Sequence, residues 1–339
     1  MSKQDMPSRA LDVDPAGRPP APSRRSLLAG GAALGATFLA APALVRAQPA
    51  VLLRLGDQKG GVEALLKASG QLADLPFRVE INQFVAAAPL LEALNAGAVD
   101  VAWAGDAPTT FALANGTPAK IVAAHRTTGA ATALLVKPGS PIRSVADLKG
   151  KTIGTSRGSI GQALVLSALK ANGLPFNTVK FAFLLPAEAK TALESGAVDA
   201  WSTWGVFIAQ GRVVDNYRVV VDGSNGILSG LSYLNALDSA IRDKRAAVAE
   251  IVRRVAIARH WANRHVDDYA RFWAGLVGVS FEVAKFSFET APSTPERIDD
   301  KVVADQQATA DLYTTAGLVQ RKLDVRQFFD TSFNGSVVV

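Results

Sequence analysis

The 339-residue sequence contains no cysteine. This absence excludes disulfide bonds, thiolate zinc sites, cysteine nucleophiles and the lipid-modified cysteine of a lipoprotein. Histidine is scarce as well, with residues only at positions 125, 260 and 265. Because the spacing of His260 and His265 does not place them on one face of a helix, we expect no metal site and no cofactor.

Excess charge is also small. The formal net charge is +6, from 36 basic and 30 acidic residues. Residues 1–47 carry six of the basic and three of the acidic residues, which leaves 30 and 27, or +3, for residues 48–339. Such a surplus suits a small anionic ligand but supplies no basic stripe for nucleic acid.

Residues 1–47 have the composition of an export signal. The segment Ser23-Arg-Arg-Ser-Leu-Leu28 precedes an Ala/Gly-rich apolar run, and Val45-Arg-Ala47 follows it. Paired arginines, a weakly apolar core and a small-residue cleavage site predict a twin-arginine signal peptide cut after Ala47. A membrane anchor is the alternative because residues 27–45 approach spanning length, but Pro42 and the Ala/Gly content disfavour it. We therefore expect a periplasmic protein that is soluble after cleavage.

A short repeat indicates two similar lobes. Gly97-Ala-Val-Asp100 recurs as Gly196-Ala-Val-Asp199, an offset of 99 residues (196 less 97), and a tryptophan follows each copy closely. Each copy reads as a helix, a left-handed glycine and a buried strand. The offset approaches the length of a small domain and exceeds the repeats of a solenoid. The sequence therefore predicts two α/β lobes with a ligand cleft between them.

Alternating strand and helix patterns continue along residues 48–339. The predicted strands are 51–55, 77–81, 121–125, 132–137, 152–155, 179–184 and 218–221, and clear helices are 62–70, 109–115 and 162–171. Breaks at 138–141 and 223–230 are predicted to carry the crossings between lobes. The predicted organisation is lobe one over 48–138, lobe two over 139–230, and a return to lobe one with C-terminal helices over 231–339.

Two strand-to-helix turns, one in each lobe, are candidates for binding an anion. Residues 105–110 and 156–162 are rich in Gly, Ser and Thr, and a helix N-terminus offers unpaired N–H groups with a partial positive charge. Arg126 and Arg157 could add charge-assisted hydrogen bonds, and Trp204 an apolar wall. A capping role for either turn is the simpler alternative.

Several motifs resemble one family of binding proteins. They are 90–108 with Leu-Asn-Ala-Gly-Ala-Val-Asp and Gly-Asp-Ala-Pro, 144–151, 185–189, 196–201, 307–312 and 322–326. In this order they are similar to the sulfonate, taurine and nitrate periplasmic binding proteins of ABC importers, especially the aliphatic sulfonate-binding proteins. The resemblance implies a type II periplasmic binding fold, a monomer, no catalysis, and two partners: a small anionic ligand and a membrane permease.

The family's ligand loops correspond to particular residues of this chain. The implied ligand-binding residues are Gln58, Lys59, Gly60, Gly105, Asp106, Ala107, Ser156, Arg157, Gly158, Ser159 and Trp204, with Arg126 added. The chain departs from the family where Trp204-Gly-Val206 replaces a common Trp-Asp-Pro, which argues against a cationic ligand tail. His125-Arg126 is more charged than usual, which favours a larger or more acidic ligand. Nitrate, a sulfate ester and a thiamine-precursor pyrimidine remain alternatives.

An enzyme is the competing interpretation. Gly154-Thr-Ser-Arg-Gly158 matches the Gly-x-Ser-x-Gly pattern of a hydrolase nucleophile, with Asp222 and His260 following in the required order. However, His260 lies in an Arg-rich amphipathic helix, and no His-Gly-Gly segment supplies an oxyanion loop. We therefore expect a binding protein, with Ser156 as nucleophile of a secreted serine hydrolase as the alternative.

Overall fold

The first lobe is built on a six-stranded mixed sheet. The computed structural model describes residues 51–338, so the predicted signal peptide, residues 1–47, lies outside the described residues. The strands are β1 (Leu52–Gln58), β2 (Arg78–Phe84), β3 (Val101–Gly105), β4 (Ala119–Arg126), β10 (Leu231–Leu237) and β11 (Thr294–Glu296), in the order β11-β4-β10-β3-β1-β2. β1 runs parallel to β2 and β3, whereas β10 runs antiparallel to β3 and β4.

A five-stranded sheet forms the second lobe. Its strands are β5 (Thr132–Val136), β6 (Thr152–Thr155), β7 (Lys180–Phe183), β8 (Ala200–Trp204) and β9 (Arg218–Asp222), in the order β7-β6-β8-β5-β9. β6 is parallel to β7 and β8, and β5 is antiparallel to β8 and β9. This order and these directions match β2-β1-β3-β10-β4 of the first lobe, so the lobes share one topology.

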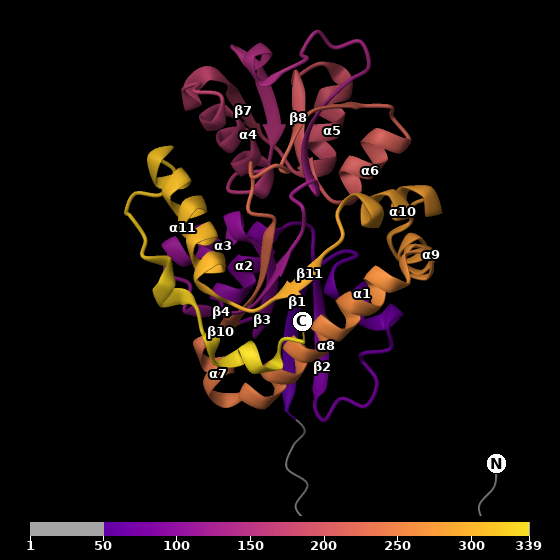
Figure 1. The fold of residues 1–339 in the computed structure, drawn as a ribbon, viewed down its shortest axis with the longest axis vertical. Helices are drawn as coiled ribbons and strands as arrows, with labels where there is room; N and C mark the ends of the chain where they lie inside the picture. The colour runs from indigo at the N-terminus through magenta and orange to yellow at the C-terminus, as the bar shows by residue number, and fades with distance from the viewer. Residues whose placement is uncertain (1–50, 339) are drawn as a thin grey trace, which may run out of the picture. The chain divides into compact units, whose positions relative to one another are not determined.

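Helices cover both sheets (Figure 1). In the first lobe they are α1 (Val62–Ala68), α2 (Ala87–Asn95), α3 (Asp106–Ala114), α7 (Asp238–Asp243), α8 (Arg245–Arg264), α9 (Val266–Val277), α10 (Phe281–Thr290) and α11 (Asp300–Thr315). In the second they are α4 (Ile160–Ala171), α5 (Pro186–Ser195) and α6 (Val206–Val213). Leucine, valine and alanine from the buried helix faces pack on strands β1 and β3, and β3 is apolar on both faces.

The repeated motif has the same structure in both lobes. Gly97 and Gly196 follow α2 and α5 with φ of 72° and 79°, the left-handed conformation expected from the sequence. Asp100 accepts a hydrogen bond from the backbone N–H of Arg54 at 2.7 Å, and Asp199 accepts one from that of Thr152 at 2.8 Å. In each lobe the aspartate that precedes one strand is therefore hydrogen-bonded to the backbone of the neighbouring strand. The strands are β3 and β1 in the first lobe, and β8 and β6 in the second.

The first crossing between the sheets lies earlier than the sequence indicated. Strand β5, residues 132–136, belongs to the second sheet, so the chain crosses at 127–131 and not at 138–141. The return crossing runs through 223–230, between β9 and β10. Backbone bonds tie the two crossings together, from the Thr127 N–H to the Gly230 carbonyl at 2.9 Å and from the Gly223 N–H to the Thr132 carbonyl at 3.0 Å.

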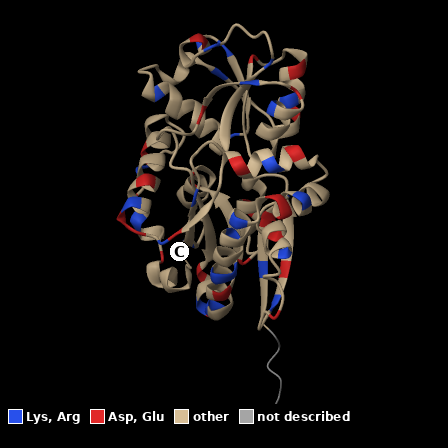
Figure 2. Cartoon of the chain, turned by 45° about the vertical axis from the view of Figure 1, so that its right-hand side comes forward, with Lys and Arg blue, Asp and Glu red and all other residues tan. Residues whose placement is uncertain are grey.

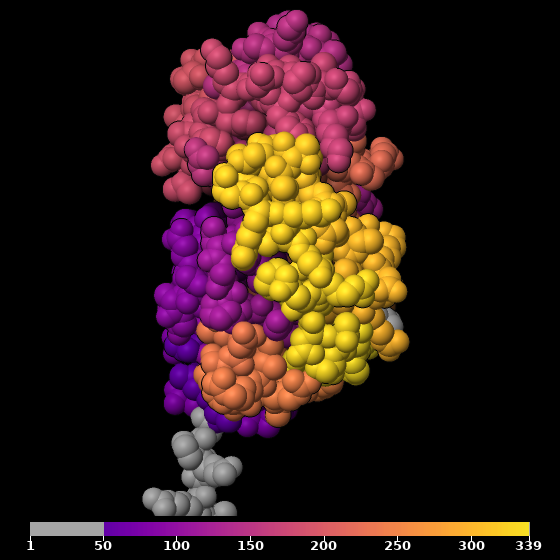
Figure 3. Space-filling model, turned by 90° about the vertical axis from the view of Figure 1, so that its left-hand side faces the viewer, coloured from indigo at the N-terminus to yellow at the C-terminus, as the bar shows by residue number. Residues whose placement is uncertain are grey.

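The C-terminal helix α11 of the first lobe also reaches the second lobe. Figure 3 shows this helix in yellow against the residues of the second lobe. The hydroxyl of Tyr313 donates a hydrogen bond to the Ser159 carbonyl at 3.2 Å, and the Tyr313 ring lies 4.7 Å from that of Phe111. Helices α3 and α11 of the first lobe therefore contact the start of α4 in the second lobe.

Candidate functional site

A cavity of about 270 Å³ lies between the two sheets. The first lobe contributes Trp103, Gly105 and Ser232 to its wall, and the second contributes Arg157 and Trp204. We call it the first cavity. Both lobes form its lining, as the cleft predicted from the sequence requires.

Four helices begin at the wall of the first cavity. Its lining includes residues at the starts of α2, α3, α4 and α6. The N-cap residues of α2, α3 and α6 are Ala86, Gly105 and Gly205, whose side chains accept no hydrogen bond from the helix. The N-termini of α2 and α6 add partial positive charge and N–H groups, which favours an anion. At α3 the Asp106 carboxylate lies in the first turn and accepts the Ala107 N–H at 2.6 Å.

The formal charge on the lining of the first cavity has one sign. Arg157 is the charged residue among those that line the first cavity, and no Asp or Glu of residues 51–338 joins it there. The guanidinium of Arg157 stacks on the Phe183 ring, 3.9 Å from its centroid. Elsewhere the charges of both signs are interspersed, as Figure 2 shows. The one formal charge on the wall of the first cavity, within residues 51–338, is therefore positive.

Seven of the residues predicted from the sequence line the first cavity: Gln58, Gly105, Ser156, Arg157, Gly158, Ser159 and Trp204. Two backbone amides expected to hold the ligand already have acceptors. The Gly158 N–H donates to Gln162 Oε1 at 2.7 Å, and the Ser159 N–H donates to the Ser156 carbonyl at 3.3 Å. The Gln162 N–H donates to Ser159 Oγ at 3.3 Å, so the Ile160 and Gly161 amides are the ones available at this turn.

Lys59 and Gly60 lie beside an adjoining cavity of about 550 Å³, which we call the second cavity. Lys59 Nζ donates to the Val277 carbonyl at 3.0 Å, and Trp273 Nε1 donates to the Gly60 carbonyl at 2.6 Å. The loop after β1 is thereby fixed to α9. The two cavities share wall residues, including Gln58 and Trp204, so they form one continuous cleft.

Asp106 and Ala107 were expected at the ligand but do not line either cavity. Both are buried. Burial raises the pKa of Asp106, while hydrogen bonds from Ser229, the Ala107 N–H and Thr309 oppose that rise. Asp106 therefore connects the start of α3 to the return crossing and to α11, a structural role that its position in the sequence did not reveal.

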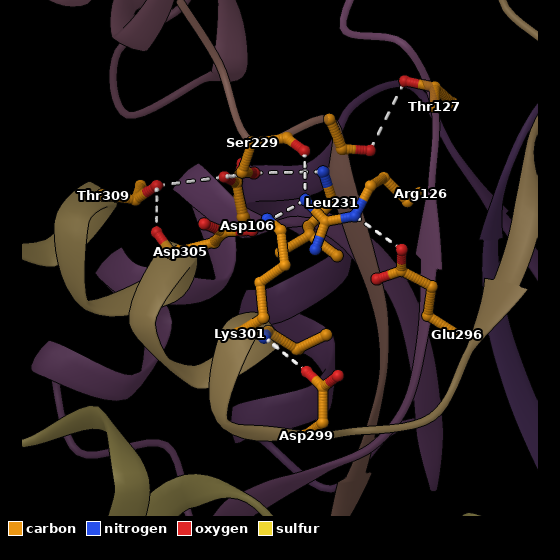
Figure 4. A network of polar contacts seen from close by, with 12 residues as sticks. Asp106, Arg126, Thr127, Ser229, Leu231, Glu296, Asp299, Lys301, Asp305 and Thr309 are labelled. Carbon is orange, nitrogen blue, oxygen red and sulfur yellow. Dashed lines mark hydrogen bonds and ion pairs between the residues drawn. The ribbon is translucent and has the colours of Figure 1, made fainter. Parts of the chain in front are cut away.

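Arg126 likewise does not line the first or the second cavity. Its guanidinium lies 2.7 Å from Glu296 and 2.8 Å from Asp305, and it donates to the Ser229 carbonyl at 2.7 Å (Figure 4). These partners compensate its charge. The Arg126 side chain therefore lies toward α11 and β11, away from the first and second cavities.

Sequence reasoning missed part of the lining. Trp103, Ser232 and residues 86–88 line the first cavity, and Arg259 lines the second. The run Ala86-Ala-Ala88 before Pro89 was the available signal, because a helix start without a capping side chain leaves its amides free for another partner. The sequence around Arg259 contains no signal that distinguishes it from the neighbouring arginines of α8.

The three residues of the hydrolase interpretation have other partners. Ser156 Oγ donates to the Leu184 carbonyl at 2.8 Å, and His260 Nε2 lies 3.0 Å from the Val338 carbonyl. The Asp222 carboxylate accepts from Ser224. No Ser-His-Asp arrangement is assembled from these side chains.

Residues 51–338 offer no cluster of three or more His, Asp or Glu side chains that could hold a metal ion. In the same range, no helix is long and apolar enough to span a membrane.

Comparisons with known proteins agree with this geometry. The NMT1/THI5-like family matches residues 73–222. An aliphatic sulfonates-binding protein of Escherichia coli (strain K12) is 32% identical over 279 residues, which cover 81% of this chain and 87% of that protein. The periplasmic aliphatic sulphonate binding protein from E. coli superimposes with a TM-score of 0.75 at 31% identity, covering 82% of this chain and 92% of the other.

Two further structures extend the comparison. The alkanesulfonate-binding protein from Xanthomonas axonopodis pv. citri bound to MOPS has a TM-score of 0.78 at 29% identity and covers 84% of this chain and 99% of its own. The desulfurization enzyme DSZB shares the fold, with a TM-score of 0.60 at 18% identity. The predicted periplasmic-binding-protein fold is confirmed. The chain belongs to the family of aliphatic sulfonate-binding proteins.

Proposed function

We propose that this protein captures a small organic anion, an aliphatic sulfonate or related sulfur compound, in the first cavity. The observation that carries this proposal is the meeting of four helix N-termini at a cavity lined by Arg157 and by no carboxylate of residues 51–338. A sulfonate presents three oxygens around one negative charge, so it can accept N–H bonds from several directions at once. The named ligands of the relatives support this class.

Delivery to an ABC transporter permease follows from the same assignment. We propose that the protein acts as a monomer in the periplasm after twin-arginine export and cleavage of residues 1–47. Supporting this are the paired arginines at 24 and 25 and the periplasmic relative from E. coli. Binding, not catalysis, is the proposed activity. The site needs no cofactor to hold an anion.

A thermal-shift screen of sulfonates, sulfate esters, nitrate and carboxylates tests the proposal. A ligand at about 100 times its dissociation constant stabilises the folded state by about 2.7 kcal/mol. We expect stabilisation by short alkanesulfonates and none by carboxylates of equal length. Stabilisation by nitrate alone, or by no sulfonate in the panel, would contradict the sulfonate assignment.

Labelling by a fluorophosphonate separates binding from hydrolysis. Because Ser156 Oγ donates to a backbone carbonyl and has no histidine partner, we expect no covalent labelling of the wild-type protein. Stoichiometric labelling that Ser156→Ala abolishes would establish the hydrolase instead.

A further inference from the structure

Arg259 of α8 lines the second cavity and forms no ion pair with a carboxylate of residues 51–338. Its Nε is buried and makes no hydrogen bond. Burial lowers the pKa of Arg259, and only Tyr269 and Asp57 act against this. The Asp57 carboxylate accepts the Glu63 N–H at 2.8 Å at the start of α1 and forms no ion pair with Arg259.

Three other partly buried arginines each form an ion pair with a carboxylate. Arg54 binds Asp100 at 2.7 Å, Arg126 binds Glu296 at 2.7 Å, and Arg254 binds Glu250 at 2.7 Å. A guanidinium remains charged under all ordinary conditions, and a buried charge without a partner is strongly destabilising. Arg259 is half-buried and no ion pair of residues 51–338 neutralises its guanidinium, so an anion in the second cavity would supply a counter-charge.

The second cavity is large and its wall is aromatic. Its volume of about 550 Å³ adds to the first cavity across a shared wall that includes Trp204. Phe207, Trp273 and Phe288 line it, and no Asp or Glu of residues 51–338 does. A small sulfonate seated at the helix N-termini would leave this space empty. A ligand with an extended apolar body would fill it.

We propose that the ligand carries two anionic groups, a sulfonate in the first cavity and a second oxyanion bound by Arg259 in the second, joined by an apolar body. This inference rests on the function proposed above and names its substrate class. The helix N-termini and Arg157 hold the sulfonate, Trp204 lies along the connecting body, and Arg259 forms charge-assisted hydrogen bonds with a carboxylate or second sulfonate.

Calorimetry with matched ligands tests the inference. Benzenesulfonate is compared with 3-sulfobenzoate and 4-sulfobenzoate, which add one carboxylate at two spans. A charge-assisted hydrogen bond predicts that at least one sulfobenzoate binds the wild-type protein about 10- to 150-fold more tightly than benzenesulfonate. Arg259→Met should reduce this ratio below about threefold while the affinity for benzenesulfonate stays within about threefold of wild type.

Arg264→Met is the matched control, because it removes the same charge from an exposed position on α8. It should leave both affinities unchanged. The melting temperature gives a second readout, since Arg259→Met should match or exceed the unliganded wild type. Arg259→Lys, which cannot bond an oxyanion in bidentate fashion, should give an intermediate ratio and replaces Arg259→Met if that variant does not fold.

Three outcomes would overturn the inference. Equal binding of benzenesulfonate and both sulfobenzoates by the wild type shows that no second anion is recognised, while the proposed sulfonate function stands. An equal loss for all three ligands in Arg259→Met or Arg259→Lys shows that Arg259 holds the sulfonate itself or only supports the fold. Failure of every sulfonate to bind contradicts the proposed function as well.

Discussion

At the scale of single residues, the charge at the first cavity depends on Arg157. Its side chain is exposed and held over Phe183, so removing it should alter binding and leave the fold intact. We expect Arg157→Ala to weaken binding of a short alkanesulfonate about 10- to 150-fold, the range of a charge-assisted hydrogen bond. Calorimetry measures this, and unfolding in urea should show a stability change within about 0.5 kcal/mol.

Two variants control for indirect effects of that substitution. Arg143→Ala removes an exposed arginine from the same lobe and should leave the affinity unchanged. Phe183→Leu keeps the charge but removes the ring that orients it, so a loss of about two- to fivefold is expected. An Arg157→Ala affinity within about twofold of wild type would mean that the helix N-termini hold the anion alone.

The sequence predicted the type of turn that lines the first cavity better than it predicted the individual lining residues. Spacing located the turns that carry Gly105 and Arg157, because strand-to-helix turns are local features. It did not give side-chain direction, which depends on distant packing. Arg126 was therefore expected at the ligand although Glu296 and Asp305 pair with it, and Arg259, which lines the second cavity, was not singled out.

At the scale of elements, the aspartates of the two repeat copies differ in their ion pairs and in their burial. Burial would raise the pKa of Asp100, but hydrogen bonds from Arg54 and Lys244 outweigh it and lower that pKa. Asp199 is 40% exposed and lies 3.6 Å from Lys151. Asparagine keeps one acceptor for the backbone amide but replaces the other oxygen by an NH₂ donor, so at Asp100 it removes the ion pairs and the hydrogen bond that this oxygen accepts.

We expect Asp100→Asn to reduce the free energy of unfolding by about 2–3 kcal/mol and Asp199→Asn by less than about 1 kcal/mol. Urea titration at neutral pH measures both. A folded pKa below the unfolded value near 3.9 makes the contribution of Asp100 complete above about pH 4 and lost as the pH falls further. The difference between wild type and Asp100→Asn should therefore shrink in acid. Equal costs for the two variants would contradict this account.

Strand and helix positions were largely predictable from local patterns, but sheet membership was not. The segment 132–137 was correctly expected to be a strand, observed as β5 over 132–136. Its partners are β8 and β9, which lie far along the chain, and nothing in the five residues specifies them. The proline pair at 138–141 was therefore a plausible but wrong place for the first crossing.

At the scale of the whole molecule, the proposed export signal can be tested through its two arginines. If Arg24 and Arg25 form a twin-arginine signal, replacing both by lysine should leave the precursor in the cytoplasm with residues 1–47 attached. Cell fractionation and mass spectrometry of the mature N-terminus, expected at Gln48, check this. Normal periplasmic accumulation of the double variant would rule out the twin-arginine route.

The two crossings should act as the hinge on which the lobes close. Hinge closure around ligand is the established behaviour of periplasmic binding proteins, and here the crossings touch backbone to backbone. A Cβ added at Gly129, where φ is 88°, would lie 2.1 Å from the Gly223 carbonyl oxygen. Gly226, where φ is 80°, has open space around it.

Gly129→Ala and Gly226→Ala therefore carry a similar backbone strain, but only the first pushes the crossings apart. Small-angle scattering on the protein without residues 1–47 should show a smaller radius of gyration when a saturating alkanesulfonate is added to the wild type or to Gly226→Ala. In Gly129→Ala the decrease should be lost or reduced, and the affinity should fall with it because the second lobe no longer reaches the ligand. Wild-type closure in Gly129→Ala would place the hinge elsewhere, and an unchanged wild-type profile at saturation would show that the lobes bind without closing.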